Sequence, residues 1–256
     1  MMLISAPVAL RWMEILAALA VLQGTFELLA VRAAISDTGT WRWNTLRAEL
    51  PWLGGVLAYR PFIALLLVRG LAAAVLLTGG HGNVTAILWV TSLLVNVRFR
   101  GTFNGGSDMM LMVVLSALVA AHVSGDSTLV VRAALLYVAA HSLISYFIAG
   151  ASKLASASWR SGAALAAFAS TPHFAPPKAL GRQLHSPARQ RAASWAVIAF
   201  ECSVPLVLVH PTAATAFVIA AFCFHLGNVW AFGLNRFLIV WAATWPALVY
   251  ASTLIR

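Results

Sequence analysis

Residues 128–151 of the chain read TLVVRAALLYVAAHSLISYFIAGA, and Ser152 and Lys153 follow directly. Arg132 is the one charged residue in this apolar run. A helix that crosses the hydrocarbon core of a bilayer needs about 20 mostly apolar residues. We therefore predict a membrane-spanning helix here, with a lysine at the point where the helix ends.

The composition extends this prediction to the whole chain. Of the 256 residues, 61% are hydrophobic and 9% are charged, whereas a soluble domain carries about 25% charged residues. So few charges cannot cover a globular surface in water, but they suffice where lipid covers most of it. The ten tryptophans fit the aromatic belts that proteins place at membrane interfaces.

We predict an all-α integral membrane protein with one domain over residues 1–256, a bundle of about eight transmembrane helices. The apolar runs span residues 8–31, 62–79, 84–97, 108–123, 128–151, 192–210, 213–231 and 237–255. The third run is short for a full crossing. The first run contains Glu14 and Glu27, and we interpret it as an uncleaved span rather than a signal peptide.

Basic residues gather in alternate connections between these runs. The segments 32–61, 98–100 and 153–191 carry arginine or lysine, and Arg236 marks the last basic connection. The intervening connections, near residues 80–83, 125–127 and 210–212, carry neither. By the positive-inside rule the basic connections are cytoplasmic, so both termini lie outside the plasma membrane. This pattern explains the net charge of +10 without a nucleic-acid partner. Three arginines fall towards the outer side and count against this orientation: Arg11, Arg132 and Arg256.

Two segments outside the spans have patterns of their own. In residues 41–50, Trp43, Leu46 and Leu50 share one helical face, which predicts an interfacial helix. In residues 155–191, the alanine-rich stretch 163–170 is too short to cross, and prolines follow it that break any long helix. We interpret 155–191 as a lid or a re-entrant segment.

Lys153 is the first candidate for chemistry. On a helix, Ser142, Tyr146, Ala149 and Lys153 are three or four residues apart and share one face. Burial disfavours the charged form of a lysine, and a neutral lysine is a competent general base. Tyr146 would then donate a hydrogen bond to the ligand. The alternative is an anchor, in which Lys153 ends its helix and extends to the lipid headgroups.

Three further polar residues lie inside apolar runs, where such groups are costly and often functional. Glu201 precedes Pro205 by four residues, and the proline leaves a backbone carbonyl near Glu201 without its helical donor. Glu201 is either catalytic or a structural carboxylate that is protonated or paired with an arginine. His225 and Asn228 are three residues apart, and they either bind a polar head group or form a hydrogen-bond pair between helices.

Asn104, Ser107 and Asp108 open the fourth run, where a helix N-cap explains the polar residues. Cys202 and Cys223 lie within apolar runs and form no CxxC motif, which is typical of small core residues. No group of histidines, cysteines and carboxylates has the spacing of metal ligands, so we expect no metal.

The segment Tyr146–Gly150, followed by Lys153–Leu154, Trp159 and Gly162, resembles the signature of a known membrane domain. This is the membrane domain of the vitamin K-dependent γ-carboxylase. Together with bacterial relatives it forms the HTTM (horizontally transferred transmembrane) family.

Two more features of the sequence support this resemblance. The run Phe224–Asn228 is similar to a second carboxylase segment, and Glu201 resembles an acidic residue at a comparable point in one of its spans. The resemblance covers most of residues 40–250.

The resemblance implies that Lys153 is a base that deprotonates vitamin K hydroquinone, or a similar quinol, before its reaction with O2. A quinol-dependent membrane enzyme of the oxygenase or carboxylase type, in a bacterial plasma membrane, is therefore the leading interpretation. We assign catalysis to Lys153, Tyr146 and Glu201, and head-group binding to His225, Asn228, Asn104 and Trp159.

Two departures favour an alternative. Gly106 stands where the carboxylase has the histidine of an Asn-Asn-His-Ser-Tyr run, and the sequence ends at Arg256, before the region that forms the large lumenal domain of the carboxylase. That domain helps to bind the protein substrate, so we do not expect peptide γ-carboxylation. The carboxylase also works on the lumenal side, whereas the charge rule puts Lys153 near the cytoplasm. The alternative is a non-catalytic membrane subunit that scaffolds, matures or exports a protein or peptide encoded nearby.

Overall fold

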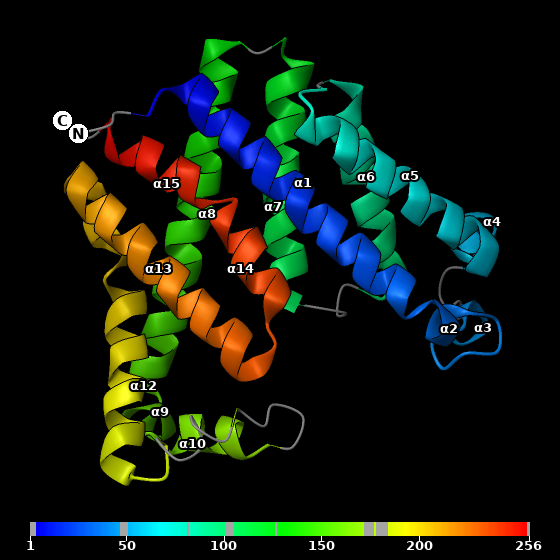
Figure 1. The fold of residues 1–256 in the computed structure, drawn as a ribbon. Helices are drawn as coiled ribbons and strands as arrows, with labels where there is room; N and C mark the ends of the chain where they lie inside the picture. The colour runs from blue at the N-terminus through cyan, green and yellow to red at the C-terminus, as the bar shows by residue number, and fades with distance from the viewer. Residues whose placement is uncertain are drawn as a thin grey trace. The chain divides into compact units, whose positions relative to one another are not determined.

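The computed structural model describes residues 4–46, 51–80, 82–100, 105–125, 127–171, 177 and 184–254. Every regular element in these ranges is helical, which confirms the all-α prediction (Figure 1). Within the same ranges, six helical stretches are long and apolar enough to cross a membrane. They are α1 (Ala6–Ala30), α5 (Tyr59–Leu77), α7 (Gly105–Val123), α8 (Thr128–Ala155), the stretch Pro187–Leu208 and α13 (Pro211–Phe232).

The two other predicted spans are built differently. The third run lies in α6 (Asn83–Arg98), a helix of 16 residues. The last run contains two helices of 8 residues each, α14 (Asn235–Ala242) and α15 (Trp245–Ser252). Pro246 lies in the first turn of α15. In a continuous helix its ring would clash with the carbonyl of Ala242, four residues earlier, so the helix ends there.

A second proline divides the stretch Pro187–Leu208. The helix α12 (Pro187–Cys202) gives way to the 3-10 helix η4 (Val204–Leu208), whose first turn contains Pro205. Proline has no N–H to donate to the preceding turn. The regular helix therefore ends one residue after Glu201, as the sequence pattern around Pro205 indicates.

The chain divides into two compact units. Unit 1 comprises residues 1–5, 135–238 and 244–256, and unit 2 comprises residues 6–134 and 239–243. In unit 1, α12 packs against two short helices, α9 (Ala157–Ser161) and α10 (Ala163–Ser170), and α13 packs against η4 and α15. These elements contain most of the candidate residues.

In unit 2, α1 packs along α5, α5 along α6, and α6 along α7 (Figure 1). Between α1 and α5 the described residues form four short helices: α2 (Arg32–Ile35), α3 (Trp43–Leu46), η2 (Pro51–Leu53) and α4 (Gly54–Leu57). The helix predicted over residues 41–50 corresponds to α3, and residues 47–50 lie outside the described ranges. Trp43, expected on the membrane-facing side of that helix, is buried instead.

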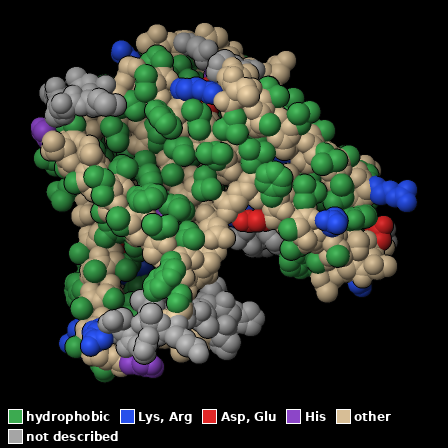
Figure 2. Space-filling model, viewed as in Figure 1, with side chains coloured by type: hydrophobic (Ala, Val, Ile, Leu, Met, Phe, Trp, Pro, Cys, Tyr) green, Lys and Arg blue, Asp and Glu red, His purple; other side chains and the backbone are tan. Residues whose placement is uncertain are grey.

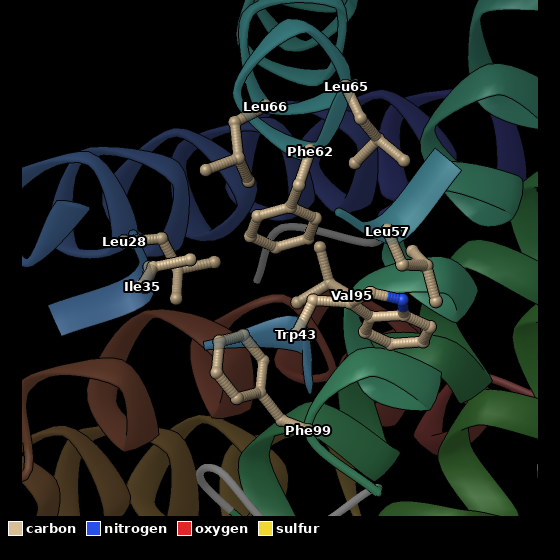
Figure 3. Close-up of a cluster of buried hydrophobic side chains, with 9 residues drawn as sticks. All are labelled: Leu28, Ile35, Trp43, Leu57, Phe62, Leu65, Leu66, Val95 and Phe99. Carbon is tan, nitrogen blue, oxygen red and sulfur yellow. The ribbon is translucent and has the colours of Figure 1, made fainter. Parts of the chain in front are cut away.

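Trp43 belongs to a hydrophobic cluster of nine buried side chains that converge from the helices of unit 2 (Figure 3). The cluster comprises Leu28, Ile35, Trp43, Leu57, Phe62, Leu65, Leu66, Val95 and Phe99.

Arg98 is fully buried and has its guanidinium carbon 4.5 Å from the ring centroid of Phe62 and 5.3 Å from that of Phe99. Its Nη1 and Nη2 donate to the backbone carbonyls of Trp41 and Ile35, each at 3.2 Å. Carbonyl oxygens and aromatic faces therefore replace water around this cation.

Arg69 lies inside the second span, a position that requires a polar partner in a bilayer. Its Nη1 donates to Thr25 Oγ1 at 2.9 Å, and its Nε donates to Ser92 Oγ at 3.3 Å. The side chains of two neighbouring helices thus supply the polar partners.

The helix surfaces of the two units are strongly apolar. Figure 2 shows hydrophobic side chains spread over the visible parts of α1, α5 and α13. In the most apolar 18 residues of the stretch Pro187–Leu208, only 28% are buried. In the corresponding part of α13, 22% are buried. Large side chains such as Leu206, Ile219 and Trp230 are more than half exposed. Exposed apolar surface on this scale indicates contact with lipid rather than water.

Candidate functional site

Lys153, near the end of α8, forms an ion pair with Glu201 of α12. Lys153 Nζ lies 2.9 Å from Oε1 and 2.7 Å from Oε2 of the carboxylate. The lysine side chain is 20% exposed and the glutamate side chain 7%. The amine is therefore directed at a carboxylate of a neighbouring helix rather than extended to lipid headgroups.

The pair forms part of the wall of a cavity of about 280 Å³ within unit 1. The cavity is lined by Lys153, Trp159, Leu165, Phe168, Val197, Glu201, Phe224, Asn228, Phe232 and Leu234. Most of this lining is apolar or aromatic, with the ion pair and the Asn228 amide as its main polar groups. Small-molecule sites commonly combine an apolar wall with a few placed polar groups, and their volumes start near 300 Å³. The cavity suits one ring system rather than a whole lipid.

Two short helices from the segment 155–191 build one side of this cavity. Trp159 of α9 lies with its ring centroid 5.2 Å from Lys153 Nζ, and Phe168 of α10 lies 6.2 Å from Trp159, measured between ring centroids. Gly162 joins the two helices with a φ of +85°, a conformation that suits glycine. A Cβ on Gly162 would also lie 2.6 Å from the backbone nitrogen of Arg191. The turn between α9 and α10 therefore packs closely against the start of α12.

Tyr146 and His225 come together, but away from the cavity lining. Tyr146 Oη lies 2.7 Å from His225 Nε2, and both side chains are buried. The rings of Phe200 and Phe217 pack edge-on against the Tyr146 ring. His225 thus pairs with Tyr146 of α8, whereas Asn228, three residues later, lines the cavity.

The structure therefore brings four of the predicted site residues to one cavity: Lys153, Glu201, Trp159 and Asn228. Tyr146 and His225 form a separate buried pair, and Asn104 lies outside the described residues. The aromatic and aliphatic lining was not predicted, because such residues carry the same sequence signal whether they face a ligand, a core or lipid.

Sequence reasoning also missed a polar cluster in unit 2. Arg11 Nη1 donates to Glu14 Oε2 at 2.7 Å, and His122 Nε2 lies 2.8 Å from Glu14 Oε1. Arg11 also donates to the carbonyls of Leu76 and Leu77 at the end of α5. Arg11 therefore caps the last turn of α5, where the Leu76 carbonyl also accepts from the backbone N–H of Gly79 at 3.2 Å, and Glu14 holds the guanidinium in place. This cluster has a sufficient structural role.

Together, the six apolar helices and the charged pair beside an apolar cavity define an integral membrane protein with a candidate small-molecule site. Residues 114–252 match the family model of the HTTM domain. The match covers more than half of the chain, so the protein belongs to the HTTM domain family. The matched range includes the whole lining of the cavity. Neither the comparison with curated proteins nor the comparison with solved structures gave a match.

Proposed function

We propose that this HTTM-domain protein binds a quinol or a similar lipid-soluble ring in the cavity beside Lys153 and takes a proton from its hydroxyl group. The single observation that carries the proposal is the Lys153–Glu201 pair, which opens onto an aromatic cavity of about 280 Å³. The rings of Trp159, Phe168 and Phe224 offer faces and edges against which a planar ring can pack. The Asn228 amide is available to hydrogen-bond an oxygen of the ring.

The proposed proton transfer uses both members of the pair. Lys153 first passes one proton of its ammonium group to the Glu201 carboxylate, and the neutral amine then takes the proton of the ligand hydroxyl. The products are a ring oxyanion, a lysine ammonium and a protonated glutamate, so one proton has moved and the total charge is unchanged. The ammonium then stabilises the oxyanion beside it. A deprotonated quinol gives up electrons more readily than the neutral form, so this step prepares the ring for oxidation.

Tyr146 and His225 have a supporting role in this proposal. Their contact at 2.7 Å joins α8 to α13, the two helices that carry Lys153 and Asn228. Because both side chains are buried and neither lines the cavity, the pair fixes the helices rather than the ligand in this proposal.

The test uses 1,4-naphthohydroquinone under anaerobic conditions with protein in detergent. We expect saturable quenching of tryptophan fluorescence and a bound-state absorbance of the ring oxyanion. Lys153→Arg should still bind the ring, but it should form the oxyanion on the order of 10²-fold less, because arginine does not release a proton at any usable pH. Glu201→Gln should show the same loss, because glutamine cannot receive the proton.

Three results would count against the proposal. A titration without saturable quenching would show that the protein does not bind a quinol of this kind. Full oxyanion formation by Lys153→Arg, with loss in Glu201→Gln, would make Glu201 alone the base. Unchanged biological function in Lys153→Ala, together with a stoichiometric partner protein on purification, would select the non-catalytic subunit instead.

We also propose that the protein lies in a bacterial plasma membrane with its basic connections in the cytoplasm, on the basis of their arginine and lysine content. The test places single cysteines at Ser127 and Ser186 in a background that carries Cys202→Ala and Cys223→Ala. A membrane-impermeant maleimide should label Ser127→Cys in intact cells and Ser186→Cys only after permeabilisation. The reverse pattern would overturn the orientation.

A further inference from the structure

The helices α8 and α12 come into close contact at Gly150, one helical turn before Lys153. A Cβ built on Gly150 would lie 2.8 Å from the backbone nitrogen of Cys202 and 2.8 Å from its Sγ. The same Cβ would lie 2.9 Å from Glu201 Cβ. All three distances are shorter than real Cβ contacts, and two of them involve the backbone nitrogen or an atom bonded directly to a Cα. Moving the Cys202 thiol aside would therefore not make room for an added methyl group.

We infer that Gly150 is a positioning residue for the Lys153–Glu201 pair. Gly150 and Lys153 are three residues apart, so they lie on the same face of α8. The absent side chain lets α12 approach so closely that Glu201 Cβ rests on this face. From that position both carboxylate oxygens reach Lys153 Nζ, at 2.9 and 2.7 Å. A role of this spacing in catalysis rests on the proposed function, whereas the spacing itself is observed in the structure.

Gly227 of α13 shows that the constraint belongs to this contact and not to helical glycines in general. A Cβ on Gly227 would meet no atom within 4 Å. An alanine there adds a methyl group and the helix preference of alanine without displacing a neighbour. Gly227→Ala is therefore the matched control for Gly150→Ala.

An alanine at Gly150 must push α12 away from α8, because the backbone nitrogen of Cys202 and the Cβ of Glu201 form the contact and neither can move without the helix. The lysine side chain is long and can follow the carboxylate in part. It cannot keep both oxygens within hydrogen-bond distance if Glu201 moves with its helix. The interaction between Lys153 and Glu201 should weaken even where the protein stays folded.

The test is a double-mutant cycle measured without ligand. Lys153→Met, Glu201→Gln and the double variant are prepared in three backgrounds: the parent, Gly150→Ala and Gly227→Ala. The readout is the non-additive part of the shift in the thermal unfolding midpoint in detergent, which isolates the interaction of the two side chains. We expect this coupling in the parent and in Gly227→Ala, and a loss of at least half of it in Gly150→Ala. Equal coupling in all three backgrounds, or none in the parent, would overturn the inference.

A second variant covers the case in which Gly150→Ala does not fold. Glu201→Asp introduces no clash but shortens the side chain by one methylene group. If Gly150 sets the spacing, aspartate falls short of Lys153 and the coupling of Lys153 to position 201 disappears. Undiminished coupling to aspartate would show that the spacing is loose, which contradicts the inference.

The same variants separate this inference from the proposed function. If both hold, Gly150→Ala should form the naphthohydroquinone oxyanion on the order of 10²-fold less than the parent, because a misplaced catalytic group costs about that much. Gly227→Ala should match the parent. Coupling that depends on Gly150, without any ring binding, would refute the proposed function and leave the positioning role intact.

Discussion

Lys153 in unit 1 and Arg98 in unit 2 are both basic residues withdrawn from water, yet they have different surroundings. Lys153 meets the Glu201 carboxylate at the wall of a cavity, and its side chain keeps 20% exposure. Arg98 has no exposed surface, donates to two backbone carbonyls and lies against the rings of Phe62 and Phe99.

The difference lies in what each partner can do. A carboxylate accepts a proton, and an amine can give one and take another, so the Lys153–Glu201 pair can exchange protons with a molecule in the cavity. Carbonyl oxygens and aromatic faces hold a cation without accepting its proton, and a guanidinium does not release one. Under the proposed function, burial of a cation serves reactivity in one unit and fixed structure in the other.

The largest effect on stability is expected from Arg98→Ala. The substitution removes the guanidinium that donates to the carbonyls of Trp41 and Ile35, and it opens a void beside Phe62 and Phe99. We expect a loss of about 3–5 kcal/mol in the free energy of unfolding. Thermal and denaturant unfolding in detergent measure it. Arg42→Ala, at an exposed arginine, is the control and should change stability by less than about 0.5 kcal/mol. Similar losses of unfolding free energy in both variants would contradict a specific structural role for Arg98.

Joint replacement of Lys153 and Glu201 tests the other half of the comparison, the ion pair in unit 1. Lys153→Met with Glu201→Leu fills similar volume without charge, and such replacements of buried pairs are often neutral or stabilising. We expect an unfolding midpoint equal to or above that of the parent, together with complete loss of oxyanion formation. The single variant Glu201→Leu should be the less stable protein, because it leaves the lysine without its carboxylate. A double variant less stable than either single one would make the pair structural.

The aromatic contact of Arg98 should contribute a smaller amount. Phe62→Leu removes the ring that lies 4.5 Å from the guanidinium carbon. We expect a loss of about 1–2 kcal/mol, from reduced packing and from the missing cation–π contact. The matched control is Phe26→Leu, in the same unit, where the side chain is 64% exposed and the change should be close to zero. An equal effect at both positions would contradict the role of the Phe62 ring.

The smallest effect is expected at Gly227, where the added methyl group meets open space. Gly227→Ala should raise the free energy of unfolding by about 0.5–1 kcal/mol, through the helix preference of alanine. Naphthohydroquinone binding should stay the same, as measured by tryptophan quenching. A marked loss of binding would show that α13 has no room near Asn228 for even one methyl group.

The positions of the helices were largely predictable, because backbone hydrogen bonds within a helix are local and a bilayer requires long apolar runs. One exception has a local cause that the sequence also contains, and the other has a tertiary cause. Pro246 divides the last predicted span into α14 and α15. Trp43 was expected at the membrane interface, but packing against Phe62 and Val95 in the hydrophobic cluster buries it.

The sequence by itself determined that Glu201 needs a partner, because a charge within an apolar run is costly in any fold. It also determined that Tyr146 and Lys153 share a face of α8, since the helical period places residues within one helix. Only the tertiary structure decided that Glu201 meets Lys153, that His225 meets Tyr146, and that Gly150 brings α12 close enough for the ion pair. These pairings join residues on different helices. They depend on the rotation and axial register of each helix, which many small packing contacts set together and no single stretch of sequence specifies.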